Sequence, residues 1–365
     1  MTSVADELAR LIAMPTQQAG GSGSAGDERS MCEYLAEKLR RRRPDEVVVE
    51  SAPRADGSPG AFVFARWGTP RRIINAHVDT VPANSGWTRS PWSPVIADGK
   101  LYGLGAADTK GAIAATLVAL ERAVPVDRGV LFSGDEEAGS AVMRAFLSSR
   151  HAHGIEQAIV CEPTARSAGI AHRGITGQRA TFEGIGGHSS KADTLPKPVV
   201  ELAKLAVAID ELGRSYLDRG SDGMNGLCTN IAALHGGVAM NVVPQYARLE
   251  WSTRPYPGFD RDAWNREVIR CAKAIDANIE IETARENPPF ACARPEPLIA
   301  LVKPFIRSVG NLDYWTEAAL LMAHGIDTIV VGPGEIGQAH AGDEFVAIDD
   351  LEWAVELLGA ALSQH

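Results

Sequence analysis

The sequence predicts an α/β fold, in which a mostly parallel sheet carries helices on both faces and is interrupted by a small α+β domain. Four short apolar runs rich in Ile and Val have the character of buried strands: 72–76, 129–133, 158–161 and 328–331. Helical segments such as 111–122 and 140–149 lie between several of them, and strands that alternate with helices are typical of a parallel sheet. In the middle of the chain this alternation gives way to a different order.

Two helices are predicted before the first of these strands, at 5–13 and 27–43. The second ends in a run of arginines followed by Pro44, and cations are favoured at a helix C-terminus because they meet the negative end of the helix dipole. Polar residues follow each of the four predicted strands along the chain. Ligands of parallel sheets bind beyond the carboxyl ends of the strands, so a site is expected at that edge.

The middle segment has the order strand, helix, strand, strand, helix, strand, which is that of a ferredoxin-like split unit. Its predicted elements are 178–184, 195–212, 227–234, 246–254, 262–275 and 277–283. We therefore expect an inserted domain at 174–286 and a larger domain made of 1–173 and 287–365. Gly174 and the turn at 287–289 are the predicted hinges.

Composition excludes some classes of function. The chain has 365 residues, with 36 Lys and Arg against 46 Asp and Glu, which gives a net charge of −10. This negative charge disfavours nucleic acid and anionic membranes as partners, since both attract positive charge. The longest apolar stretches are about half of the roughly 20 residues that cross a bilayer. Acids near the N-terminus speak against a signal peptide, and five scattered cysteines fit a cytoplasmic protein with reduced thiols.

The first candidate site residues follow the run 72–76. His77 and Asp79 are two residues apart, which puts their side chains on the same face of a strand. Such a pair can form a structural hydrogen bond, or it can bind a metal, because His is the commonest metal ligand. Asp108 comes after a glycine-containing turn and before a helix, so it is either a helix N-cap or a ligand.

Further carboxylates and a second histidine follow the other strands. Three adjacent acids end the second run: Asp135, Glu136 and Glu137. They could lie near a helix N-terminus, but three acids at the end of a buried strand are costly unless a cation is near. Glu162 could cap a turn, and His340 could be a polar loop residue. Together, two histidines and several carboxylates at one sheet edge predict a two-metal hydrolytic site, with zinc favoured and cobalt or manganese as substitutes.

These residues lie in motifs through which nearly the whole chain resembles the family of zinc aminoacylases, acetylornithine deacetylases and succinyl-diaminopimelate desuccinylases. The motifs are 77–82, 103–111, 135–137, 161–164, 187–190, 241–244 and the segment around His340. Segments 314–318 and 332–340 resemble the acetylornithine deacetylase branch and, within it, acetylcitrulline deacetylases. The chain departs from the commoner family pattern at Leu104, where arginine is usual, and at Thr109, where methionine is usual. Neither position is a ligand in the family.

The resemblance implies a role for each residue of the predicted metal site. His77 and Glu162 would bind one metal ion, and Glu137 and His340 would bind the other. Asp108 would bridge the two ions. Asp79 would orient His77, and Glu136 would act as the general base.

The predicted inserted domain supplies the remaining candidates. The resemblance implies a homodimer in which His188 of one subunit stabilises the oxyanion in the site of its partner, so that 174–286 serves as a lid and dimerisation domain. Arg254 could bind a substrate α-carboxylate through its guanidinium group, or it could be a surface arginine at a strand end. Asn241 could contact the same carboxylate, or it could be a turn residue.

Three functions remain open at this point. The first is hydrolysis of an Nα-acetyl-amino acid to acetate and the free amino acid, with N-acetylcitrulline or N-acetylornithine of arginine biosynthesis as substrate. The second is a two-metal carboxypeptidase or dipeptidase of the same fold. The third is a non-catalytic relative that binds metal and ligand, although Glu136, which is not a ligand, speaks against it. A cationic ornithine side chain would require a carboxylate in the pocket, whereas citrulline would require neutral partners.

Overall fold

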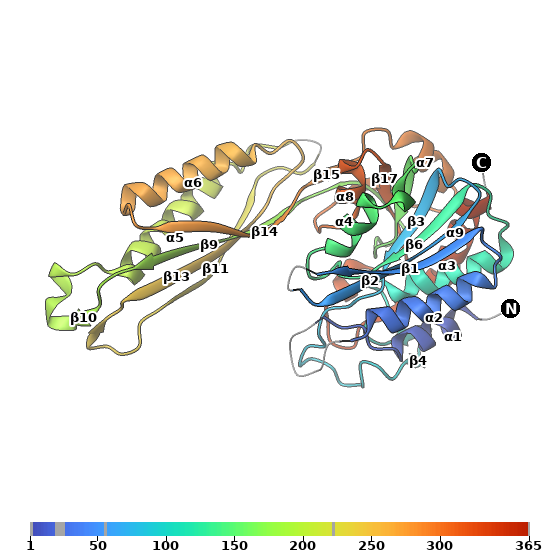
Figure 1. Ribbon diagram of the computed structural model, residues 1–365, viewed down its shortest axis with the longest axis horizontal. Helices are drawn as coiled ribbons and strands as arrows, with labels where there is room; N and C mark the ends of the chain where they lie inside the picture. Colours follow the sequence, from blue (N-terminus) through green and yellow to red (C-terminus); the bar gives the residue numbers. More distant parts are fainter. Residues whose placement is uncertain (1–2, 19–25, 55–56, 221–222, 364–365) are drawn as a thin grey trace. The chain divides into compact units, whose positions relative to one another are not determined.

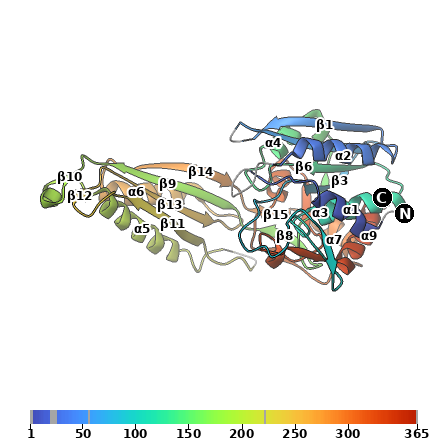
Figure 2. The same cartoon turned by 90° about the horizontal axis from the view of Figure 1, so that it is seen from below.

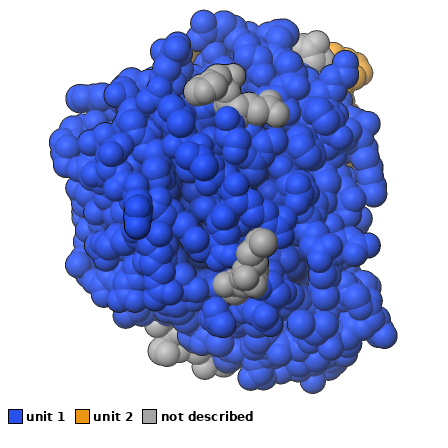
Figure 3. Space-filling model, turned by 90° about the vertical axis from the view of Figure 1, so that its right-hand side faces the viewer, with its two compact units in different colours: residues 1–170, 292–310, 316–365 blue, residues 171–291, 311–315 orange. Residues whose placement is uncertain are grey.

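The computed structural model describes residues 3–18, 26–54, 57–220 and 223–363. The chain forms two compact units. Unit 1, blue in Figure 3, consists of Met1–Ile170, Cys292–Gly310 and Thr316–His365, and unit 2 of Ala171–Ala291 and Asn311–Trp315. The insertion predicted at 174–286 lies within unit 2, which also contains residues 171–173, 287–291 and 311–315.

Unit 1 is built on a mixed sheet whose centre is parallel (Figure 1). From one edge the strands are β1 (Glu46–Pro53), β2 (Pro59–Trp67), β6 (Arg128–Ser133), β3 (Arg72–His77), β7 (Gln157–Val160), β17 (Asp327–Val330) and β8 (Ala168–His172). Strands β6, β3, β7 and β17 run parallel. They are the four strands predicted from the sequence, and their carboxyl ends meet at one edge. Strands β1, β2 and β8 are antiparallel to their neighbours.

Helices cover both faces of this sheet, because side chains alternate between the faces along each strand. Ala61, Val63 and Ala65 of β2 belong to the large core with α1, α2, α3 and α9. Phe62 and Phe64, at the alternate positions of β2, face the opposite side of the sheet, where their rings contact Phe146 of α4. The helices of unit 1 are α1 (Val4–Ile12), α2 (Glu28–Arg40), α3 (Lys110–Arg122), α4 (Ala141–Ser148), η1 (Arg150–Ala152), α7 (Glu296–Val302), α8 (Ala318–Ala323), η3 (Ile336–Gln338) and α9 (Ile348–Ser363).

A small antiparallel sheet in unit 1 joins two distant loops. Its strands are β4 (Val95–Ala97), β5 (Lys100–Tyr102) and β18 (Phe345–Ala347), with β5 in the centre. The turn that carries Asp108 follows β5, and the loop that carries His340 precedes β18. The pairing of β5 with β18 therefore brings these two segments together.

Unit 2 has the predicted strand and helix order around an antiparallel sheet. Figure 2 shows its long strands side by side in the order β14 (Glu280–Asn287), β9 (Ile175–Glu183), β13 (Tyr246–Arg254) and β11 (Cys228–Gly236). Helices α5 (Pro198–Arg214) and α6 (Arg261–Ile275) pack on it, with Trp251 and Trp264 in their shared core. Its shorter elements are β10 (Gly187–His188), η2 (Ser189–Thr194) and β12 (Val242–Val243). Two further short strands, β15 (Phe290–Ala291) and β16 (Val309–Leu312), pair with β8 at the end of the large sheet. No helix within the described ranges is long and apolar enough to cross a membrane.

Candidate metal centre

Five predicted ligands lie together at the carboxyl edge of the parallel strands. His77 ends β3, Glu137 and Glu162 follow β6 and β7, Asp108 precedes α3, and His340 follows η3. The two oxygens of Asp108 face different histidines, with Oδ1 2.9 Å from His77 Nε2 and Oδ2 3.3 Å from His340 Nε2. Each histidine has a further carboxylate, since His77 Nε2 lies 3.8 Å from Glu162 and His340 Nε2 lies 2.9 Å from Glu137. Two half-sites thus share one carboxylate.

The donor set fits divalent metal ions. One ligand atom each from His77, Asp108 and Glu137 lies within 4.8 Å of the others. Imidazole nitrogens combined with carboxylate oxygens are ligands of zinc and of neighbouring transition metals. Each half-site offers one imidazole and one carboxylate of its own in addition to the Asp108 carboxylate, which is a donor set suited to two ions.

The ionised forms of several carboxylates in the cluster are unfavourable without a cation, because these groups are buried and close to one another. Burial and neighbouring carboxylates raise the pKa values of Glu136 and Glu162 well above their usual range, although His77 opposes the shift. Hydrogen bonds to Asp108 and Glu137 raise the pKa of His340 to about 11. A bound cation would favour the ionised carboxylates and the neutral histidines, which are the forms that bind metal.

Asp79 holds the first histidine and the following acidic turn in place. It is fully buried, and its carboxylate accepts the backbone N–H groups of Glu136 and Glu137, each at 3.1 Å. Its Oδ1 lies 3.5 Å from His77 Nδ1. The hydrogen bond of His77 Nδ1 goes to the backbone carbonyl of Asp79, at 2.9 Å. Burial opposes ionisation of Asp79, but the neighbouring His77 ring and hydrogen bonds from Gln18 and the backbone keep its pKa below the usual value. One side chain thus fixes residues that belong to both half-sites.

Thr109, at which the chain departs from the commoner family pattern, also braces the end of β3. Its hydroxyl accepts the backbone N–H of His77 at 3.0 Å and donates to the backbone carbonyl of His77 at 2.9 Å. The hydroxyl therefore links the Asp108 segment directly to the strand that carries the first histidine. A methionine could not donate to the carbonyl, and its thioether sulfur is only a weak acceptor.

His340 lies in a loop whose conformation is held by contacts with another segment of the chain. Its backbone is left-handed, with φ of 59°. Asn84 donates to the His340 carbonyl at 2.9 Å, and the Asp343 carboxylate accepts the backbone N–H groups of residues 88 and 89. Gly342 lies so close to Gly86 that a Cβ on it would overlap the Gly86 carbonyl. The second histidine is thus positioned by the segment 84–89.

Two buried groups behind the cluster have no role predicted from the sequence. Gln18 donates to Asp79 at 2.6 Å and to Glu28 at 3.2 Å, and Glu28 also pairs with Arg54. No motif marks these residues, because they come from a loop, a helix start and a strand end. Glu317 accepts the Ser133 hydroxyl at 2.6 Å, and burial raises its pKa to about 7. Glu317 did have a sequence signal, since it lies in the motif at 314–318.

The other predicted site residues lie in unit 2, not in the unit that carries the cluster. His188 is exposed on β10, and its Nδ1 accepts the backbone N–H of Ser190. Asn241 lies next to it in the structure, since its carbonyl accepts the N–H of Ser189 at 3.0 Å. Arg254 ends β13, where burial and then the charge of Arg285 lower its pKa. These three residues thus form two locations in unit 2.

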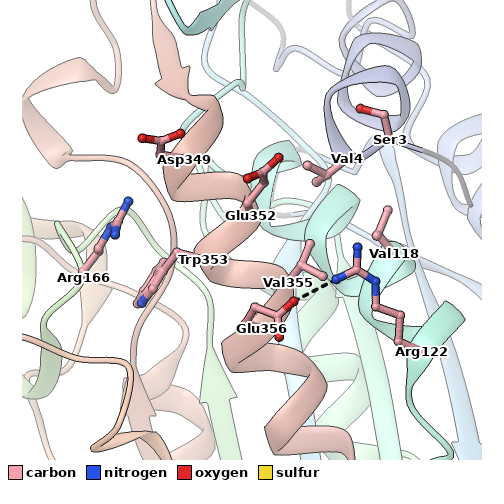
Figure 4. A pocket seen from close by; sticks show the side chains of 10 residues that line it. All are labelled: Ser3, Val4, Val118, Arg122, Arg166, Asp349, Glu352, Trp353, Val355 and Glu356. Atoms are coloured by element: carbon pink, nitrogen blue, oxygen red, sulfur yellow. Dashed lines mark hydrogen bonds and ion pairs between the residues drawn. The ribbon is translucent and has the colours of Figure 1, made fainter.

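A separate cavity in unit 1, of about 660 Å³, contains none of the cluster residues (Figure 4). Residues of α1, α3 and α9 line it, together with Ser3 and Arg166. Its two arginines are paired within unit 1, Arg122 with Glu356 at 2.8 Å and Arg166 with Asp350 at 2.6 Å. This pairing gives the cavity little attraction for an anion.

Comparison with known proteins gives a consistent result. The profile of peptidase family M20/M25/M40 matches residues 73–364. The N-acetyl-L-citrulline deacetylase of Xanthomonas campestris pv. campestris is 33% identical over 98% of this chain and 96% of its own length. The acetylornithine deacetylase of Proteus mirabilis is 28% identical over 96% of this chain and 93% of its own. The M20 family metallo-carboxypeptidase Sso-CP2 from Sulfolobus solfataricus has the same fold, with a TM-score of 0.79 at 17% identity over 99% of both chains.

Proposed function

The chain belongs to peptidase family M20/M25/M40, and from this premise we propose that it is a dinuclear metal amidohydrolase that releases acetate from an Nα-acetyl-amino acid. The observation that carries the proposal is the position of Asp108 between His77 and His340, each with its own further carboxylate. This arrangement supports the binding of two ions on one shared carboxylate. The donor set favours Zn²⁺, with Co²⁺ or Mn²⁺ as substitutes.

In this proposal each residue of unit 1 has a defined task. His77 and Glu162 would hold one ion, Glu137 and His340 would hold the other, and Asp108 would bind both. When bound, the ions supply Lewis acidity and lower the pKa of water toward roughly 7. Glu136 accepts the proton of the attacking water and returns it to the leaving amine. The upward shift of the Glu136 pKa, caused first by burial, suits a group that must keep that proton briefly.

His188 is proposed to stabilise the oxyanion in the site of a partner subunit, which makes the active form a homodimer. Its Nδ1 accepts a hydrogen bond from the backbone N–H of Ser190. The ring proton of a neutral His188 therefore belongs on Nε2, which leaves Nε2 as the donor that an oxyanion requires. The exposure of His188 supports a role toward a group outside its own unit.

Arg254 and Asn241 are proposed to bind the α-carboxylate of the substrate. Arg254 is close enough to Arg285 for the second charge to lower its pKa, so the two guanidinium groups together attract an anion. A carboxylate fits the planar donor fork of arginine in a bidentate manner. Asn241 is exposed beside His188, at the other location in unit 2, so in the proposed homodimer its amide would donate, as His188 would, to a substrate held in the site of the partner subunit.

N-acetylcitrulline and N-acetylornithine of arginine biosynthesis are the proposed substrates, because the two deacetylases described above act on these compounds by name. A carboxypeptidase or dipeptidase activity is the alternative, and the fold shared with Sso-CP2 accommodates it. The test is an assay of the zinc-loaded enzyme on Nα-acetylcitrulline, Nα-acetylornithine, Nα-acetylmethionine and a dipeptide, with a chelator control. Acetate release from the first two supports the proposal. Faster dipeptide cleavage, or acetate release that persists with chelator, contradicts it.

A further inference from the structure

Glu344 is a buried acid that has no assigned role and lies four residues after His340. Its carboxylate accepts the backbone N–H groups of Gly105 at 2.9 Å, Ala107 at 2.9 Å and Asp108 at 3.1 Å. We infer that Glu344 is a positioning residue for the metal centre, because it fixes the backbone from which the shared carboxylate projects. This inference rests on the proposed function, in which Asp108 binds both ions.

The turn before Asp108 depends on an outside acceptor. The N–H of Ala106 is bound within the turn, to the Gly103 carbonyl, but the buried N–H groups of Gly105, Ala107 and Asp108 precede α3 and have no helical carbonyl available. Gly105 has φ of 80°, a left-handed conformation that glycine adopts without steric cost. A buried N–H without an acceptor costs about 1–3 kcal/mol. Glu344 supplies the acceptors, with Oε1 shared by Ala107 and Asp108 and Oε2 bound to Gly105.

Glu344 also joins the two ligand-bearing segments. Its backbone carbonyl accepts the N–H of Gly103 at 2.9 Å, and the strand that follows it pairs with β5. Because Oδ1 and Oδ2 of Asp108 face different histidines, a displacement of the Asp108 backbone would alter both half-sites at once. Loss of the Glu344 carboxylate should therefore weaken the binding of both ions together.

The plainer interpretation is that Glu344 balances the charge of Lys110, a buried lysine whose pKa is lowered to about 7 by burial although the Glu344 carboxylate acts to raise it. The hydrogen bonds of Lys110 go elsewhere, however, since its Nζ donates to the carbonyls of Leu11 at 3.1 Å and Met14 at 2.9 Å. The three contacts of the Glu344 carboxylate are all backbone N–H groups of the turn. The contacts thus favour a role in holding the turn over a role in pairing charge.

The test measures metal binding in the absence of substrate. Metal-free wild type, Glu344→Ala, Glu344→Gln and the exposed control Glu352→Ala are titrated with Zn²⁺ against a chromophoric chelator, and absorption spectra are recorded with Co²⁺. Glu344→Ala should lower the affinity for both ions about 10–100-fold, which is the usual effect of losing a group that orients metal ligands. It should also alter the Co²⁺ spectrum. Glu344→Gln should show a smaller loss, because its carbonyl can still accept from Ala107 and Asp108.

The outcomes separate this inference from the proposed function. Wild type that binds fewer than two ions contradicts the dinuclear site itself. If wild type binds two ions, then Glu344 variants with affinities within about threefold of wild type and unchanged Co²⁺ spectra overturn the positioning role. If Glu344→Ala fails to fold, Glu344→Gln decides, since it preserves the shape of the side chain. Equal losses in Glu352→Ala would also overturn the inference.

Discussion

Replacement of Asp79 by Asn tests how much the metal centre depends on a single buried acceptor. The Asp79 carboxylate accepts three hydrogen bonds, from Glu136 at Oδ1 and from Glu137 and Gln18 at Oδ2. An Asn side chain has one acceptor oxygen. In the orientation that loses least, this oxygen keeps the two bonds at the Oδ2 position and the NH₂ group turns toward the N–H of Glu136. One buried donor is then left unpaired.

The size of the effect follows from that count. An unpaired buried N–H costs about 1–3 kcal/mol, so the free energy of unfolding of the metal-free Asp79→Asn protein should fall by that amount. The displaced turn carries Glu136 and Glu137, and His77 loses the charge beside its Nδ1. Metal affinity should therefore fall about 10–100-fold, as when groups behind metal ligands are removed in other proteins.

Urea unfolding of the metal-free protein and Zn²⁺ titration against a chelator measure the two quantities separately. Asp98→Asn is the matched control, because Asp98 is exposed and its left-handed φ of 50° suits Asn as well as Asp. The control should leave both quantities unchanged. An Asp79→Asn protein with wild-type unfolding free energy and wild-type Zn²⁺ affinity would refute the reasoning.

Four further predictions address the base, the dimer, the His340 loop and pH. Glu136→Gln should keep both metal ions but lose about 10²–10⁴-fold in kcat; bound metal with near-normal turnover contradicts its role as base. Mixed dimers of Glu136→Gln and His188→Ala subunits should regain activity, whereas no recovery after verified subunit exchange contradicts completion of the site by a partner. Gly342→Ala should weaken metal binding, since its Cβ would overlap the Gly86 carbonyl and displace the His340 loop; unchanged affinity on titration contradicts this. The pKa of Glu317 is about 7 in the folded protein against 4.5 when unfolded, so its contribution to stability is fully present below pH 4.5 and is lost as pH rises through 7. In the metal-free protein, Glu317→Gln should flatten this fall of the unfolding free energy with pH, measured by urea unfolding. An unchanged pH dependence would refute the raised pKa of Glu317.

The central strands could be predicted from the sequence because they are buried on both faces. The predicted runs 72–76 and 129–133 correspond to β3 and β6 within one residue at each end. Strands β1 and β2 were not predicted, and neither was the small sheet with β5. The three-residue strands β4, β5 and β18 depend on pairing between segments far apart in the chain, so no local pattern marks them.

The site divides in the same way. His77, Glu137 and Glu162 could be found because each lies at the end of a strand or soon after one, and the structure places them near one another, while their roles as ligands stay predictions. Gln18 and Glu344 could not be assigned, because their effect arises only from contacts with residues 61 and more than 200 positions away. A buried acceptor for backbone N–H groups leaves no signature in composition or spacing.

The order of the cluster residues along the chain has a consequence for synthesis on the ribosome. His77, Asp108, Glu137 and Glu162 emerge first, but His340 and its brace Glu344 emerge only after the whole of β9–β14. The delay between residues 162 and 340 is 340 − 162 = 178 residues. At roughly 5–20 residues per second, this is about 9–36 s during which the nascent chain exposes carboxylates that lack their second histidine. Maturation of the centre is thus tied to completion of the polypeptide, and a prematurely terminated chain would contain at most one complete half-site.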